Sequence, residues 1–243
     1  MKVSAKSDVG AVRQNNQDFC LSGEFSDGVT WALVCDGMGG ANGGNIASES
    51  AAKTISDKLN FGYHQAMNDN SIKHLIVSAI EAANATVFSH SRSDSSLKGM
   101  GTTVVLAIIK NDALYIAHVG DSRIYIVTND SITQLTNDHS VVQLMLDRGE
   151  ISAEEAKDHP QKNVITRALG VDDTIRIDYS QEIYNEGDIV LLCSDGLTNF
   201  VDDSKIKQIC NTYDGYSLAD VLVAEANRNG GGDNVTVVTV TDR

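Results

Sequence analysis

Short runs of apolar and β-branched residues, each seven or eight residues long, recur along the chain and predict β-strands. Most are apolar at consecutive positions, so both faces of these strands should be buried. The segments Asn111-Asp112 and Gly120-Asp121-Ser122 separate neighbouring runs and predict tight antiparallel reversals, so we expect a meander. The predicted strands span residues 2–8, 29–35, 102–109, 113–119, 122–128, 188–194 and 234–241.

Apolar residues at helical spacing predict amphipathic helices, as where Ile72, Leu75, Ile76, Ala79 and Ile80 fall on one stripe. Such helices need a sheet to cover. Because they are grouped before and after the strands, we expect an α+β fold with an antiparallel β-sandwich clad in helices, rather than regular βαβ alternation. The predicted helices span residues 45–59, 71–91, 138–148, 151–157, 203–212 and 217–228.

The chain has 243 residues, of which 42% are hydrophobic, and its single proline, Pro160, lies in no linker-like stretch. We therefore expect one domain over residues 1–243 and exclude intrinsic disorder. No apolar run approaches the roughly 18 residues of a membrane span, and MKVSAKSDVG holds no stretch typical of a signal peptide. A cytoplasmic monomer with no membrane partner is the expectation.

Acidic residues outnumber basic ones by 33 to 19, which leaves a net charge of −14 and argues against nucleic-acid partners. Aspartate supplies 24 of these acidic residues, and aspartate favours turns, helix caps and sites for hard metal ions. The cysteines at positions 20, 35, 193 and 210 form no CxxC pair and are interpreted as reduced thiols. The six histidines form no HxH or HExxH pair, so surface or core positions are expected; His139, after Asp138, is the one of interest.

Four aspartates stand at the ends of predicted strands. Asp36, Asp121 and Asp195 each follow an apolar run beside a glycine or serine, and Asp233 precedes the last run. A single Asp-Gly pair is typical of a turn. Four carboxylates meeting at one sheet edge would repel each other unless a cation neutralised them, and all-oxygen ligation favours Mg²⁺ or Mn²⁺.

The segment VRQNNQD adds two further candidates, Arg13 and Asp18. An arginine can grip a phosphate through its planar fork, and an aspartate can hold metal-bound water. Taken alone, such an arginine is more often a surface residue.

Together these segments resemble the metal-dependent Ser/Thr protein phosphatases of the type 2C (PPM) family. The resemblance runs from residue 9 to residue 238, and its motifs in this order are far more specific than any one of them. They are VGAVRQNNQD, VCDGMGG, GMGTTVV, AHVGDSRIY, LTNDHS, RALG, LLCSDGLTNFV and GGGDNVTVV.

The resemblance implies an αββα sandwich, with helices on both outer faces, and a binuclear Mn²⁺ or Mg²⁺ centre at one end. Asp36 would bridge the two ions, the Gly37 carbonyl would bind the second, and Asp195 and Asp233 would complete the first. The implied reaction is attack by a metal-bridging water on phosphoserine or phosphothreonine in proteins, the products of a Ser/Thr kinase.

The resemblance also implies roles outside the binuclear centre. Asp18 would hold metal-bound water, Arg13 would bind the substrate phosphate, and Asp121 with Asp195 would ligate a third ion, as expected for bacterial members. Met38 stands where eukaryotic members carry a histidine that is the usual candidate general acid, and Gln17 stands where many members have glutamate. Methionine cannot donate a proton, and its presence is typical of the bacterial branch.

Two other functions compete with this one. An aspartyl-phosphate phosphatase would need a DxDxT nucleophile, but Asp36 is followed by Gly-Met-Gly. A calcium-binding or pseudophosphatase scaffold would keep the fold without catalysis, but Asp36, Asp195, Asp233 and Arg13 are all present. Finally, the polar segment 147–167 predicts an exposed helical flap, and the resemblance implies that it lies beside the metal centre.

Overall fold

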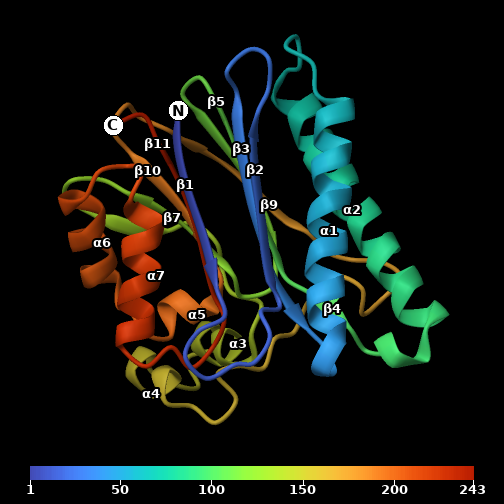
Figure 1. Cartoon of the computed structure of the whole chain (residues 1–243). Helices are drawn as coiled ribbons and strands as arrows, with labels where there is room; N and C mark the ends of the chain where they lie inside the picture. The colour runs from blue at the N-terminus through green and yellow to red at the C-terminus, as the bar shows by residue number, and fades with distance from the viewer.

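The computed structural model describes residues 1–243, apart from the side chains of residues 40–42. Two antiparallel sheets face each other, and a pair of helices covers the outer face of each sheet (Figure 1). Both chain termini lie at one end of this sandwich, and the short helices gather at the other end. The expected α+β sandwich, flanked by helices on both faces, is confirmed.

The first sheet is built from the two ends and the middle of the chain, and helices α6 (Asp203–Thr212) and α7 (Leu218–Arg228) cover it. Its strands, in spatial order, are β1 (Lys2–Asp8), β11 (Val235–Thr241), β10 (Ile189–Cys193), β7 (Arg123–Val127) and β8 (Ile132–Gln134).

The second sheet lies under the two longest helices, α1 (Gly40–Gly62) and α2 (Asp69–Ser93). Among the described residues, no helix combines the length and the apolar character that a membrane span requires. The strands of this sheet, in spatial order, are β2 (Asp18–Glu24), β3 (Thr30–Met38), β5 (Val104–Lys110), β6 (Ala113–Val119) and β9 (Asp178–Ile183), with β4 (Gly101–Thr102) paired to β3.

The core has three layers, which explains the continuous apolar runs. Along β5, Val104, Leu106 and Ile108 pack with the residues of α1 and α2. The alternating residues Val105 and Ala107 pack with side chains of the opposite sheet. A third cluster joins β10 and β11 to α6 and α7. A central strand between a helix layer and a second sheet must be apolar at every position.

Three strands, β2, β8 and β9, are missing from the sequence-based prediction, and each lies at an edge of its sheet. β9, for example, has the sequence DYSQEI, and its last three residues are exposed. An edge strand with an exposed face contains too few apolar residues to stand out from a loop. The sequence pattern therefore marks the central strands of both sheets and, among the four edge strands, only β1, which matches the predicted strand 2–8.

The predicted meander is correct at one reversal and wrong at the other. β5 and β6 form a hairpin around Asn111, which has a φ of 56°. At Gly120, however, the chain leaves the second sheet and enters the first, because β6 pairs with β9 whereas β7 pairs with β10. Gly120 has a φ of 106°, and a Cβ there would lie 2.5 Å from Thr103 Cγ2. Its tight turn puts Asp121 at the end of the sandwich.

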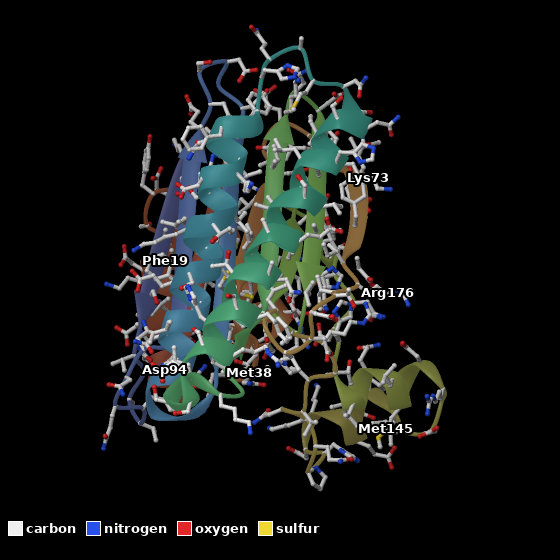
Figure 2. The ribbon with its side chains drawn as sticks, turned by 90° about the vertical axis from the view of Figure 1, so that its right-hand side faces the viewer. Phe19, Met38, Lys73, Asp94, Met145 and Arg176 are labelled. Carbon is white, nitrogen blue, oxygen red and sulfur yellow. The ribbon has the colours of Figure 1, made fainter. Side chains whose placement is uncertain are left out.

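The segment around the predicted flap is only partly helical. Helix α3 (Val141–Asp147) is capped by Ser140, and α4 (Ala153–Lys157) begins with a capping box between Ser152 and Glu155. The rest of the segment, residues 158–167, consists of turns and irregular backbone with an isolated bridge at Ile165, and it is mostly exposed. Figure 2 shows this region, with Met145 labelled, projecting from the end of the sandwich. The remaining short helices are η1 (Ser95–Leu97) and α5 (Asp195–Thr198).

All four cysteines are free thiols, as expected. Cys35, Cys193 and Cys210 are buried, and Cys20 is half-buried. Burial raises the pKa of the Cys20 thiol to about 11 and the pKa values of the other three thiols further. A protonated thiol is a poor nucleophile, so these cysteines act as small apolar residues.

Candidate active site

The strand ends that carry the predicted aspartates lie at the end of the sandwich opposite the termini (Figure 1). Asp18 and Asp36 face each other as register partners on β2 and β3. Asp195 follows β10, and Asp233 precedes the adjacent antiparallel strand β11, so these two meet at the same end. The loop between β6 and β7 brings Asp121 to the same end, close to Asp195. The antiparallel pairing of the strands thus brings the predicted residues together.

Electrostatic repulsion within this group is evident at Asp36. Burial raises the pKa of the Asp36 carboxyl well above its usual range, and the negative charges of Asp18, Asp195, Asp121 and Asp233 raise it further. Each of these carboxylates is close enough to disfavour a negative charge on Asp36. The four strand-end aspartates and Asp18 therefore interact as one electrostatic cluster.

The backbone around Asp36 is held by two threonines of the neighbouring strand segment. Asp36 N–H donates to Thr103 Oγ1 at 3.0 Å, and Thr102 Oγ1 donates to the Asp36 carbonyl at 2.9 Å. The next residue must be glycine, because a Cβ on Gly37 would lie 2.1 Å from the Gly44 carbonyl oxygen. Likewise, a Cβ on Gly44 would lie 2.7 Å from the Gly37 carbonyl oxygen. The glycines allow helix α1 to start directly against this loop.

Asp18 is the most deeply buried carboxylate of the cluster, with 7% of its surface exposed. Ser194 Oγ donates to Asp18 Oδ2 at 2.7 Å and itself accepts a hydrogen bond from Thr236 N–H at 3.0 Å. Burial raises the pKa of Asp18 to about 7, although hydrogen bonds from the side chains of Ser194 and Thr236 favour its charged form. Ser194 is a site residue that the sequence analysis missed, and its position directly before Asp195 was the available signal.

The pKa values of Asp195 and Asp121 are also raised, which means that their charged forms are disfavoured. Burial and the charge of Asp233 raise the pKa of Asp195, although Asn199 Nδ2 donates to its Oδ2 at 3.0 Å. Burial, followed by the charge of Asp195, raises the pKa of Asp121 to about 7. Asp121 therefore belongs to the same electrostatic group as Asp195, on the side nearest the flap.

Arg13 is exposed and reaches the cluster from the loop between β1 and β2. Its Nη2 donates to Asp233 Oδ2 at 2.8 Å. Asn234 fixes this loop, because its amide donates to the carbonyls of Val9 and Asn15 at 2.9 and 3.0 Å. Sequence analysis missed Asn234, which directly follows Asp233. The guanidinium group of Arg13 is thus held beside the Asp233 carboxylate and stays exposed to solvent.

The donor chemistry of this cluster fits hard divalent cations. Five carboxylates and the Gly37 carbonyl offer oxygen atoms, which Mg²⁺ and Mn²⁺ prefer. Only one arginine side chain, that of Arg13, forms an ion pair with the cluster among the described residues. Burial and the neighbouring carboxylates raise the pKa values of Asp36 and Asp195, as expected for a cluster with more negative than positive charge. Divalent cations would supply the missing positive charge.

Comparison with known proteins agrees with this geometry. The family model of protein phosphatase 2C matches residues 11–224. The chain belongs to the protein phosphatase 2C family. The protein phosphatase PhpP of Streptococcus pneumoniae is 41% identical over 245 residues, which cover 99% of this chain and 97% of that protein. These findings establish the chain as a metal-dependent phosphoprotein phosphatase of the bacterial type.

Solved structures of the protein phosphatase 2C family share the whole fold. The S. agalactiae serine/threonine phosphatase has a TM-score of 0.93 and 35% identity, and the match covers 100% of this chain and 99% of that one. The catalytic domain of the serine/threonine protein phosphatase PstP, solved in complex with two manganese ions, has a TM-score of 0.85 and 31% identity, with coverage of 98% and 96%. The expected Mn²⁺ or Mg²⁺ cofactor agrees with that complex.

Proposed function

We propose that this protein phosphatase 2C member hydrolyses phosphoserine and phosphothreonine in proteins, with its five clustered aspartates as the metal site. The observation that carries the proposal is the convergence of Asp36 and the other four carboxylates at one end of the sandwich. Asp36, the Gly37 carbonyl, Asp195 and Asp233 would hold the two catalytic ions. Asp121 and Asp195 would hold a third ion.

Two divalent cations bound here would lower the pKa of water so that it attacks phosphorus, and would stabilise the departing oxygen. The protein's own residues would bind the substrate phosphate and orient the water. Asp18, supported by Ser194, would hold metal-bound water. Arg13 would hold the phosphate oxygens. Free cysteines with raised pKa values offer no competing nucleophile.

The cellular setting belongs to the same proposal. The substrates would be proteins phosphorylated by a Ser/Thr kinase in the cytoplasm, and the enzyme would act as a monomeric signalling phosphatase of one domain, residues 1–243. The net charge of −14 would favour phosphoproteins with basic residues near the phosphate and disfavour nucleic acids.

Phosphate release from a phosphothreonine peptide tests the function directly. We expect hydrolysis with Mn²⁺ or Mg²⁺ and at least about tenfold less with Ca²⁺, because Ca²⁺ binds oxygen ligands in looser geometry and activates water poorly. Rates at equal metal concentrations, with a chelator blank, measure this. Release no faster than the blank with all three ions would instead support the non-catalytic scaffold.

Arg13→Ala should weaken substrate binding more than it slows chemistry. We expect KM for the phosphothreonine peptide to rise about tenfold or more, because a charge-assisted phosphate contact is lost. Mn²⁺ affinity, measured by calorimetry, should stay close to the wild-type value. Arg92→Ala, in the last turn of α2 and therefore in the other helix layer, is a matched control for removing an exposed arginine. An unchanged KM would assign Arg13 to the surface.

A groove beside the flap supports a role of the flap in the recognition of protein substrates. A groove of about 870 Å³ lies between flap residues such as Lys157 and Lys162 and the segment that contains Asn199, which holds Asp195. Residues 149–162 can be replaced by a short Gly-Ser linker without removing the contacts at the flap root. We expect kcat/KM for a phosphoprotein to fall about tenfold and that for p-nitrophenyl phosphate to change less than about twofold. Equal losses for both substrates would contradict a role in protein recognition.

A further inference from the structure

His118, His139 and Asp178 form a second cluster of titratable groups beside the aspartates. Their potential ligand atoms lie within 4.8 Å of one another, and the two imidazole rings stack with centroids 4.6 Å apart. Both histidines are buried. His118 and Asp178 are register partners on β6 and β9, and His139 lies in the loop that leads into the flap.

His139 satisfies both backbone groups of the residue before Asp121. Its N–H donates to the Gly120 carbonyl at 2.9 Å, and Gly120 N–H donates to His139 Nδ1 at 3.0 Å. A ring nitrogen that accepts a hydrogen bond carries no proton, so the proton of the neutral ring is on Nε2. Gly120 lies just beyond β6 and has no strand partner there. His139 supplies the hydrogen bonds that a neighbouring strand would otherwise make.

The other edge of the ring faces an ion pair. His139 Nε2–H donates to Asp178 Oδ2 at 3.2 Å, while Arg167 Nη1 donates to Asp178 Oδ1 at 2.8 Å. The same Arg167 nitrogen lies 3.0 Å from His139 Nε2. A guanidinium group thus occupies the edge that a metal ion would need. His118 Nε2 lies 2.9 Å from the Asn137 carbonyl and must donate to it. The cluster is a hydrogen-bonded support and not a metal site.

His139 also connects the chain that leads into the flap with the chain that leaves it. His139 O accepts a hydrogen bond from Thr166 N–H at 2.7 Å, one residue before Arg167. Next to it, Val141 N–H donates to Val164 O at 2.9 Å, and Ser140 and Ile165 form an isolated bridge. The Asp121 turn, the flap root and the start of β9 therefore all meet at His139.

We propose that His139 is a positioning residue, which fixes the Asp121 turn through Nδ1 and ties that turn to the root of the flap. The turn has little freedom on its other side, since Gly120 lies against Thr103 and Thr103 Oγ1 is 2.7 Å from Ser122 Oγ. Loss of the Nδ1 contact leaves the Gly120 N–H, which is buried, without an acceptor. The consequence for catalysis rests on the proposed role of Asp121 as a metal ligand.

Two amide variants distinguish the contact made by Nδ1 from the contact made by Nε2. In His139→Asn, the amide oxygen can accept from Gly120 N–H as Nδ1 does, whereas the contact with Asp178 is lost. In His139→Gln, the amide can reach the place of Nε2, whereas the acceptor for Gly120 is lost. In the metal-free protein, we expect amide exchange of Gly120 to become at least about tenfold faster in His139→Gln and to stay within about threefold in His139→Asn.

The functional readout is the Mn²⁺ dependence of p-nitrophenyl phosphate hydrolysis. In His139→Gln, the Mn²⁺ concentration for half-maximal rate should rise about tenfold while kcat at saturating Mn²⁺ changes less than about threefold; His139→Asn should resemble the wild type. Circular dichroism and thermal denaturation check that both variants fold. If His139→Gln does not fold, Asp178→Asn replaces it, because this substitution weakens the hydrogen bond from His139 Nε2–H. We then expect amide exchange of Gly120 to become about threefold faster.

Each outcome decides the proposal. Unchanged Gly120 exchange in His139→Gln, or equal effects of the two amide variants, would overturn it. Faster exchange with an unchanged Mn²⁺ dependence would overturn the catalytic consequence and leave His139 a purely structural residue. If the wild-type protein hydrolyses no phosphate ester with any metal, the proposed function fails, and the exchange measurement still shows whether His139 holds the turn.

Discussion

Replacement of Asp36, Asp195 or Asp233 by alanine is expected to remove nearly all hydrolysis of a phosphothreonine peptide. Each substitution deletes an oxygen ligand from the cluster that would hold the two catalytic ions. Initial rates at saturating Mn²⁺ measure the effect, and calorimetry with Mn²⁺ shows whether ion binding is lost with it. Asp57→Ala, an exposed aspartate on α1, is the matched control and should keep wild-type activity.

Retention of more than about a tenth of the activity, a loss of ~1.4 kcal/mol or less in transition-state stabilisation, would contradict the assignment of that residue. Loss of activity with unchanged Mn²⁺ binding would point to a role in substrate binding instead. Far-ultraviolet circular dichroism must match the wild type. We expect the fold to persist, because these carboxylates repel one another in the absence of metal.

That repulsion leads to the second large effect, on stability. Asp18→Asn is expected to stabilise the metal-free protein at pH 8, by an amount on the order of 2–4 kcal/mol, because the buried carboxylate no longer has to ionise. Burial raises the pKa of Asp18 to about 7 from an ordinary value of 3.8. The folded protein therefore binds a proton that the unfolded chain has released, and wild-type stability falls as the pH rises between these two values.

Thermal denaturation with a chelator at pH 5, 6, 7 and 8 measures this effect. The wild-type melting temperature should fall toward pH 8, and the pH dependence of Asp18→Asn should be flatter. Added Mn²⁺ should stabilise the wild type more than the variant, since the ions neutralise the cluster. A wild-type melting temperature that rises with pH across this range in the chelator would contradict the expected sign.

Apolar periodicity located most of the fold because the sandwich buries its central strands on two faces. Strand β6 and helix α6 begin and end at the predicted residues, and both central strands β10 and β11 were found. Helix α1 begins at Gly40, well before the predicted residue 45, because its glycine-rich first turns contain no apolar stripe. Edge strands such as β9 were missed for the same reason: a half-exposed segment has no apolar pattern.

For the candidate site, too, one part could be predicted from the sequence and another part could not. The position of Asp36, Asp195 and Asp233 beside glycines at strand ends was visible in the sequence, and the family motifs assigned them roles. Their convergence depends on which strands pair. β10 and β11 are neighbours in one sheet while β3 belongs to the other, and this arrangement cannot be read from spacing.

By itself, the sequence determined the chemical identity of this protein: the ordered aspartate motifs, the expected oxygen-ligated metals and the apolar strands of a sandwich. Only the tertiary structure decided that Ser194 holds Asp18, that Asn234 fixes the loop of Arg13, and that His139 ties the flap root to Gly120. These contacts join segments that are distant in the chain. Local patterns report burial and turn preference, whereas a hydrogen bond between distant loops leaves no period in the sequence, because its geometry is set by the packing of the sheets between them.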